Sequence, residues 1–345
     1  MSELMHYVIC GNYRPLLFAL YLKNNLDEIT VITDKEKIVK FCKNENISII
    51  QMNSLSFKRD IINMLRFKSY RSYLDDFIDK INPKKGDIFY MLCIMRKANH
   101  FFYLTKEISK KYGNKIYYYN PNIEGPRYKF HLKKPIFFRA ELFRIFLKII
   151  FDIDMIYITD NRGLPCLRLN NKFLDKNNIK MFPLEKSFEE IVFELSKNYK
   201  TNYKDFDNLI VDSTELKSVL KKDTLKNFYN NLLDLKLEFY IKKKPSVSYK
   251  SDYYSVFEKC EEVPSFIPVE LLFNNVRKNV ISMYSFSLHI AAKFDNLNAI
   301  SLIDLVEWKN DKAKEMRRDY LVKKSDNKIL FPKNFDELKK LLAGN

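Results

Sequence analysis

Two serines in the second half of the chain are spaced as they would be in a phosphate-binding turn. Ser285 and Ser287 follow a strand-like run and open a helix-like one. The N–H groups and the positive dipole end at a helix start attract anions, and the serine hydroxyls add donors for a phosphate. Ordinary helix capping by serine accounts for the same pattern equally well. The pair predicts a phosphate contact without establishing one.

A block at residues 267–272, of sequence Ile-Pro-Val-Glu-Leu-Leu, is the most specific of these motifs. Pro268 pre-sets the entry into a helix, and Glu270 falls in its first turn. A carboxylate at this place could grip a ribose hydroxyl. A negative charge at a helix start is also favourable in its own right, so both interpretations stay open.

A basic run at residues 242–244 ends another strand-like segment and precedes Pro245. If the strand continues through the run, Lys242 and Lys244 project to the same side. Positive charges there could neutralise a departing phosphate. A solvated run of lysines has the same appearance in a sequence.

In the first half of the chain, Glu124 follows a strand-like run and is followed by Gly125. Open α/β sheets bind their ligands beyond the carboxyl ends of the strands. A carboxylate there, beside a glycine that permits a tight turn, could take the proton of an attacking hydroxyl. From these residues alone, a solvent-exposed loop glutamate is the simpler interpretation.

The elements that must position these residues alternate between strand and helix along the chain, which is typical of parallel sheets with crossover helices. At roughly 150 residues per domain, a chain of 345 residues predicts two domains, which we place at residues 1–185 and 186–345. The predicted strands are residues 6–10, 28–34, 47–51, 87–93, 115–119, 155–159, 209–212, 237–241, 280–283 and 299–305. The predicted helices are residues 16–23, 35–44, 57–81, 102–112, 140–150, 187–197, 225–235, 268–275, 285–293 and 334–342.

The composition narrows the class of partner. The formal net charge is +17, which favours polyanions such as nucleic acid, anionic lipid or nucleotide-sugar phosphates. Lysines that serve only solubility would give the same charge. No block of five or six consecutive basic residues occurs, which argues against a nucleic-acid-binding tail.

Cysteine usage and hydropathy favour a cytoplasmic protein. Five cysteines are widely spaced with no CxxC pair, which is typical of reduced thiols. No signal peptide is visible, and no apolar stretch approaches the ~18 residues needed to span a bilayer. Residues 130–150 mix basic and apolar side chains, so peripheral contact with the inner face of an anionic cytoplasmic membrane stays open beside a helix packed between domains.

Taken in order, these blocks resemble the bacterial sialyltransferases of glycosyltransferase family 52 and, less closely, the bacterial polysialyltransferases. The family carries an acidic-acidic-Gly motif, a His-Pro motif, an Ile-Pro-x-Glu-Leu-Leu segment and a serine pair. Here Ile123 stands in place of the first acidic residue, and Phe286 separates the two serines. The opening residues 8–20 also resemble the first strand, loop and helix of the family.

This resemblance implies a GT-B fold, in which two Rossmann-like α/β domains face each other across a cleft. It implies an inverting transfer of a sialic acid-type (nonulosonic) sugar from a CMP-activated donor to a hydroxyl of a lipooligosaccharide or capsular glycan. It implies that no metal or other cofactor takes part. The expected partners are therefore the nucleotide-sugar donor and an oligosaccharide or glycolipid acceptor, with no nucleic acid and with a homodimer left open.

Residue roles follow from the matched motifs. Glu124 would be the catalytic base, and Lys244 would stand where the family has the histidine that assists departure of the phosphate. The remaining expected ligands are Gly11, Asn12, Gly125 and Tyr128 for the substrate, and Ser213, Thr214, Lys242, Pro245, Pro268, Glu270, Ser285 and Ser287 for the donor nucleotide.

The lysine at position 244 leaves three alternatives, because a lysine at its reference pKa of about 10.4 is a poor proton donor at neutral pH. Lys244 acts electrostatically, another residue donates the proton, or the enzyme is weak or inactive. His289 could be that donor, although a histidine at this place more often belongs to the packing of a helix. Two Asp-x-Asp triplets, at residues 152–154 and 205–207, match a metal-binding pattern that also occurs often by chance.

Overall fold

The chain folds into two compact units, Met1–Phe188 (unit 1) and Glu189–Asn345 (unit 2). The sequence-based boundary at residues 185 and 186 falls just before the helix that opens unit 2. The computed structural model describes residues 4–26, 28–53, 67–92, 99–119, 145, 148–149, 152, 155–159, 165–169, 171–177, 179–212, 219–221, 223–243 and 254–343.

Unit 1 is built on a six-stranded sheet with the order β3-β2-β1-β4-β5-β8, in which every neighbouring pair is parallel. A separate antiparallel hairpin joins β6 and β7. The strands are β1 (His6–Ile9), β2 (Ile29–Thr33), β3 (Ser48–Gln51), β4 (Ile88–Leu92), β5 (Lys115–Tyr119), β6 (Met155–Thr159), β7 (Pro165–Leu169) and β8 (Ile179–Met181). The helices are α1 (Tyr13–Lys23), α2 (Glu36–Asn44), α4 (Phe67–Ile81), α5 (Asn99–Tyr112) and α7 (Asn171–Lys176).

The sheet of unit 1 is covered on both faces because its strands alternate their side chains between two apolar layers. Tyr7 and Ile9 belong to the core formed with α4 and α5. On the other face, the Tyr90 ring packs edge-on against Phe18 of α1, with 5.8 Å between centroids. Strands that are buried on both faces read as continuous apolar runs, which is why the sequence located them.

Unit 2 repeats this plan with a five-stranded parallel sheet of order β11-β10-β9-β12-β13. Its strands are β9 (Phe206–Val211), β10 (Tyr240–Lys242), β11 (Glu261–Glu262), β12 (Val276–Ser282) and β13 (Asn298–Ser301). Its helices are α8 (Phe188–Asn198), α9 (Thr224–Leu233), α10 (Phe286–Ala291), α11 (Asp311–Lys324) and α12 (Phe335–Ala343), and its 3-10 helices are η2 (Tyr254–Lys259) and η3 (Val269–Asn275).

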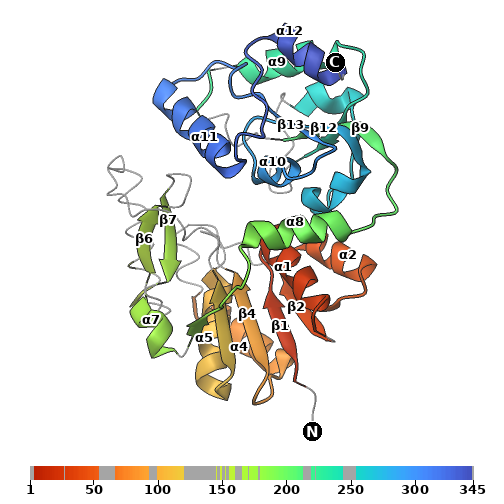
Figure 1. Ribbon diagram of the computed structural model, residues 1–345. Helices are drawn as coiled ribbons and strands as arrows, with labels where there is room; N and C mark the ends of the chain where they lie inside the picture. Colours follow the sequence, from red (N-terminus) through yellow and green to blue (C-terminus); the bar gives the residue numbers. More distant parts are fainter. Residues whose placement is uncertain are drawn as a thin grey trace. The chain divides into compact units, whose positions relative to one another are not determined.

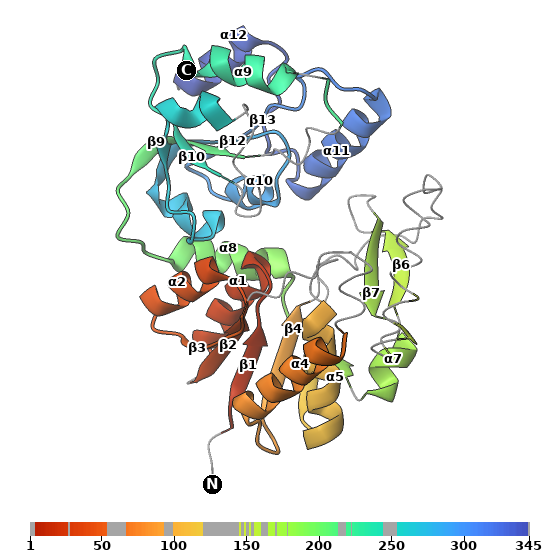
Figure 2. The same ribbon diagram turned by 180° about the vertical axis from the view of Figure 1, so that it is seen from behind.

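The helices of unit 2 form two groups on opposite sides of its strands. Figures 1 and 2 show α9 and α12 side by side on one side of the strand layer, where Phe228 meets Phe335 at 6.2 Å. The other group contains α10, α8 and η3, which meet where Phe294 packs against Phe193 and Phe273. The residues within each group come from distant parts of unit 2.

These observations confirm the predicted α/β class with two Rossmann-like units. Facing of the units across a cleft stays a prediction. Residues 155–159 form a strand as expected, although it pairs in the hairpin and not in the parallel sheet. The predicted helix at residues 140–150 lies largely outside the described residues. Six described elements were not predicted, namely β7, α7, β8, β11, η2 and α11.

No helix within the described ranges has the length and apolarity needed to cross a bilayer. Cys10, Cys42 and Cys260 are free thiols, and burial raises the pKa of Cys42 to about 12 and that of Cys260 to about 11.

Candidate functional site at the strand ends of unit 2

The strand order of unit 2 defines where a ligand would bind. From β9 the chain moves outward through β10 to β11, and it then returns to β12 on the other side of β9. Connections therefore leave the neighbouring strands β9 and β12 in opposite directions. In open α/β sheets, ligands bind beyond the carboxyl ends of the strands at such a reversal. Asp212 follows β9 at this place, and Ser285 follows β12.

Side-chain hydrogen bonds fix the strand ends at this reversal. The Ser282 hydroxyl at the end of β12 donates to the carbonyl of Val211 at the end of β9, at 2.9 Å. The Ser301 hydroxyl at the end of β13 donates to the carbonyl of Met283, at 2.8 Å. Both bonds are buried. The loops that follow β9, β12 and β13 therefore start from fixed strand ends.

Ser285 is the N-cap of α10. Its backbone is extended, with φ −147° and ψ 145°, and its Oγ accepts a hydrogen bond from the Ser287 amide at 3.2 Å. The Leu288 amide in turn donates to the Ser285 carbonyl at 3.2 Å. The sequence offered ordinary helix capping by serine as one interpretation, and the structure confirms that Ser285 caps α10. The hydroxyl proton of the half-buried Ser285 can still be donated to a ligand.

The central contact of the site joins two of the sequence blocks. The Ser287 hydroxyl donates to Glu270 Oε1 at 2.7 Å, and the two residues are only 4% and 7% exposed. Glu270 comes from the first turn of η3, for which Pro268 is the N-cap, as the sequence predicted. Because the Ser287 proton is directed at Glu270, this serine offers a ligand its oxygen lone pairs and not a donor.

Lys242 lies at the same edge, as the last residue of β10, and is 4% exposed. Its ammonium donates to the carbonyls of Pro264 and Ile267, at 2.5 Å each. Both acceptors belong to the loop that leads into Pro268. The role of Lys242 as a nucleotide ligand stays a prediction, and these two contacts are with the main chain.

In unit 1, Gly11 and Asn12 follow β1, also at the carboxyl edge of a sheet. Asn12 is the N-cap of α1, and its Oδ1 accepts from the Arg14 amide at 2.9 Å. The Thr33 hydroxyl donates to the Cys10 carbonyl at 2.7 Å and fixes the start of this loop. The roles of Gly11 and Asn12 in substrate binding stay predictions.

The site residues that lie outside the described residues are Glu124, Gly125, Tyr128, Ser213, Thr214, Lys244 and Pro245.

Two alternatives from the sequence have a clear placement. His289 is 2% exposed within α10, and its ring lies 5.0 Å from that of Tyr320, so it belongs to the packing of the helix. Asp205 and Asp207 lie at the amino end of β9, away from the strand ends that carry Ser285. They pair with Arg277 and Lys278 at 3.8 Å and 2.7 Å, respectively.

A group of aromatic and basic residues beside Ser285 escaped the sequence analysis. The Arg317 guanidinium, 8% exposed on α11, lies 5.9 Å from the ring of Tyr284 and 5.6 Å from that of Trp308. Nearby, Asp304 accepts from Lys314 and Arg318 at 3.0 Å each. The only signals in the sequence are a single tryptophan and an Arg-Arg pair.

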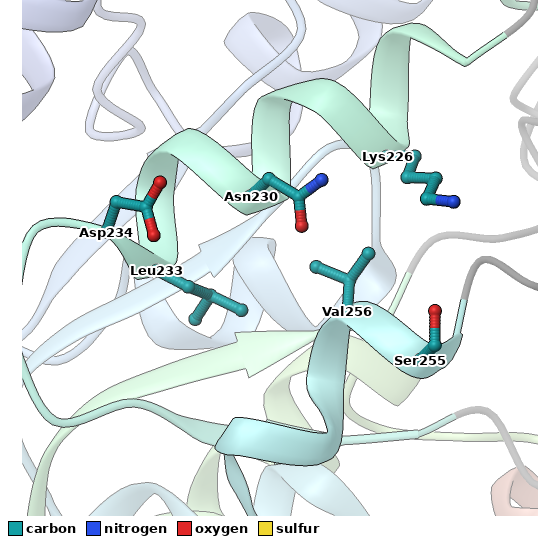
Figure 3. A pocket seen from close by; sticks show the side chains of 6 residues that line it. All are labelled: Lys226, Asn230, Leu233, Asp234, Ser255 and Val256. Atoms are coloured by element: carbon teal, nitrogen blue, oxygen red, sulfur yellow. The ribbon is translucent and has the colours of Figure 1, made fainter.

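Two hollows on the described surface lie away from this site. Figure 3 shows one between α9 and η2, lined by Lys226, Asn230, Asp234 and other residues, with a volume of about 120 Å³. That is smaller than the roughly 300–1,000 Å³ of pockets that enclose a drug-sized ligand. A second hollow, of about 300 Å³, lies near Glu238 and Cys260. Neither is lined by a motif residue.

No family model matches the chain, and no curated protein matches its sequence. Solved structures of low similarity span most of its length. The glycotransferase of kitacinnamycin has a TM-score of 0.46 at 8% identity and covers 100% of this chain and 91% of its own. UDP-N-acetylglucosamine 2-epimerase has a TM-score of 0.46 at 11% identity, covering 94% and 91%. A glycosyltransferase from Rickettsia africae has a TM-score of 0.36 at 13% identity, covering 100% and 97%. At TM-scores this low, the likeness identifies no activity.

Proposed function

We propose that the protein is a glycosyltransferase that moves a sialic acid-type sugar from a CMP-activated donor to a hydroxyl of a surface glycan. The observation that carries the proposal is the buried hydrogen bond between Ser287 and Glu270. It joins two blocks of the family resemblance at the place where a Rossmann-like sheet binds its ligand. A chance resemblance of short motifs gives no reason for the two to meet there.

In the proposed reaction, Glu124 takes the proton of the acceptor hydroxyl as the oxygen attacks the anomeric carbon of the sugar. The bond between that carbon and the phosphate oxygen of CMP breaks, and the configuration inverts. Positive charge from Lys244 stabilises the departing phosphate electrostatically, because a lysine is a poor proton donor at neutral pH. The Ser285 hydroxyl donates to the phosphate, and Glu270 accepts from the ribose hydroxyls.

Ligand-dependent thermal unfolding tests the donor class. A ligand that binds only the folded state stabilises it by about 2.7 kcal/mol at 100 times its Kd. We expect CMP and CDP to raise the unfolding temperature, and Glu270→Gln to reduce that shift. Stabilisation by UDP or GDP instead would assign another nucleotide sugar. No shift with any nucleotide would reject the proposal.

Two assays test the reaction itself, one of CMP-sialic acid hydrolysis without an acceptor and one of sugar transfer to glycan acceptors. Glu124→Gln is expected to abolish transfer while leaving CMP binding intact, since the base does not hold the nucleotide. The proposal requires no metal, so activity should survive EDTA. Unchanged transfer by the Glu124→Gln variant would remove the assigned base.

A further inference from the structure

The contacts of the buried Lys242 ammonium differ from those expected of a lysine that binds a phosphate. A residue that waits for an anion should present its charge at an open edge. Lys242 instead ends β10 almost fully buried and donates to the carbonyls of Pro264 and Ile267. Burial of a charge is costly unless hydrogen bonds compensate it, so these contacts define where the ammonium can lie.

The two carbonyls belong to the turn that delivers Glu270. The Ile267 amide donates to the Pro264 carbonyl at 3.3 Å, and the Leu271 amide donates to the Pro268 carbonyl at 3.1 Å. The turn therefore continues directly into η3. Lys242 fixes both ends of residues 264–267, and Glu270 follows three residues later. The other end of this connection is fixed where Glu270 accepts from Ser287.

We propose that Lys242 is a positioning residue for Glu270, which holds the turn at residues 264–267 so that the carboxylate meets Ser287 at the strand ends. This inference rests on the proposed function for the identity of the ligand, CMP, and on the contacts alone for the positioning. It replaces a phosphate contact by Lys242 with an effect transmitted through the main chain.

The test uses the full chain and the variant Lys242→Met, which keeps the length of the side chain and removes the ammonium. Lys278→Met is the matched control, because Lys278 lies in the same sheet but forms an exposed ion pair with Asp207. If Lys242→Met does not fold, Lys242→Gln retains a neutral donor and takes its place. Affinity for CMP and for cytidine, which lacks the phosphate, is measured for each variant.

We expect Lys242→Met to weaken the affinities for CMP and for cytidine by the same factor, about tenfold. In a Glu270→Gln background, the same substitution should weaken these affinities by less than about twofold further, because the effects of residues that act through one another are not additive. A loss confined to CMP would show direct phosphate contact and overturn the proposal. Unchanged affinity for both ligands would overturn it as well.

Hydrogen exchange of the free protein separates this inference from the proposed function. In Lys242→Met, the amides of Ile267 and Leu271 should lose protection, while Lys278→Met leaves them protected. Unchanged protection would reject the positioning role whatever the ligand is. Lost protection in a protein that binds no nucleotide would reject the proposed function and keep the positioning role.

Discussion

At the scale of single residues, the site depends on the direction of one proton. The sequence left two interpretations of Ser285 and Ser287 open, namely donors to a phosphate and ordinary capping of a helix. In the structure, Ser285 caps a helix and Ser287 donates to Glu270. Residue types and spacing could locate the pair at a helix start. They could not give the direction of the hydroxyl, because that depends on a carboxylate 17 positions away in the chain.

Removing the Ser287 hydroxyl should therefore act through Glu270. Ser287→Ala removes the hydroxyl that donates to the buried Glu270 carboxylate, which costs about 1–3 kcal/mol of unfolding free energy. Urea unfolding measures the loss. CMP titration should show weaker binding by Ser287→Ala, and adding Ser287→Ala to Glu270→Gln should weaken binding no further. Ser255→Ala, at an exposed serine of η2, is the control. Equal stability and affinity for Ser287→Ala and the unchanged protein would contradict this assignment.

His6 provides a residue-scale prediction on pH. Its Nδ1 lies 3.0 Å from the Tyr90 hydroxyl, and burial lowers its pKa below the ordinary 6.5, partly opposed by the nearby Asp87. The neutral form is therefore favoured in the folded state. Its stabilisation is fully present above pH 6.5 and decreases as the pH falls through the lower folded pKa, because the unfolded chain binds the proton first.

The variant His6→Phe keeps an aromatic ring and removes the titration. Urea unfolding at about pH 7.5 and about pH 5.5 should show that the unchanged protein loses more stability on acidification than the variant does. Equal losses in the two proteins would show that His6 does not contribute to the acid sensitivity of the fold.

At the scale of elements, central strands such as β2 and β4 were predictable because burial makes them apolar along almost their whole length. The missed helix α11 shows where that approach ends. Its buried residues are Arg317 and Leu321, and the rest of its sequence is largely charged. A search for apolar periodicity counts arginine as polar, although here the guanidinium packs between Tyr284 and Trp308. The edge strand β11 was missed because it consists of two exposed glutamates.

Helix α8 is held at its carboxyl end by one amide. Asn274 Nδ2 donates to the carbonyls of Ser196, Lys197 and Tyr199 at 2.8, 3.0 and 2.9 Å. Carbonyls in the last turn of a helix lack donors within the helix, and the Asn274 side chain supplies hydrogen bonds to them. Asn274→Ala should lower the unfolding free energy by about 1–3 kcal/mol. Asn230→Ala, at an exposed position of α9, should change it little, and matching effects for the two variants would contradict the capping role.

At the scale of the whole molecule, each unit contains its own parallel sheet with the strand order expected of a Rossmann-like domain. In unit 2, the candidate site is built from β9, β10, β12, η3 and α10, all of which lie within Glu189–Asn345. The alternation of strands and helices along the sequence predicted that each half of the chain contains a parallel sheet. They could not predict the placement of Lys242, because a buried lysine and a solvated one look the same in a sequence.

Unit 2 should therefore fold without unit 1. Its opening helix is fastened inside the unit, where Lys324 pairs with Glu189 at 3.0 Å and the ring of Phe193 packs on that of Phe294 at 5.3 Å. A domain with its own core can fold independently. Residues 186–345, produced alone, should unfold cooperatively in urea and gain stability from CMP, with Glu270→Gln reducing the gain. A fragment that unfolds without a transition would show that the core of unit 2 depends on unit 1. A fragment that unfolds cooperatively but gains no stability from CMP would place essential nucleotide contacts in unit 1.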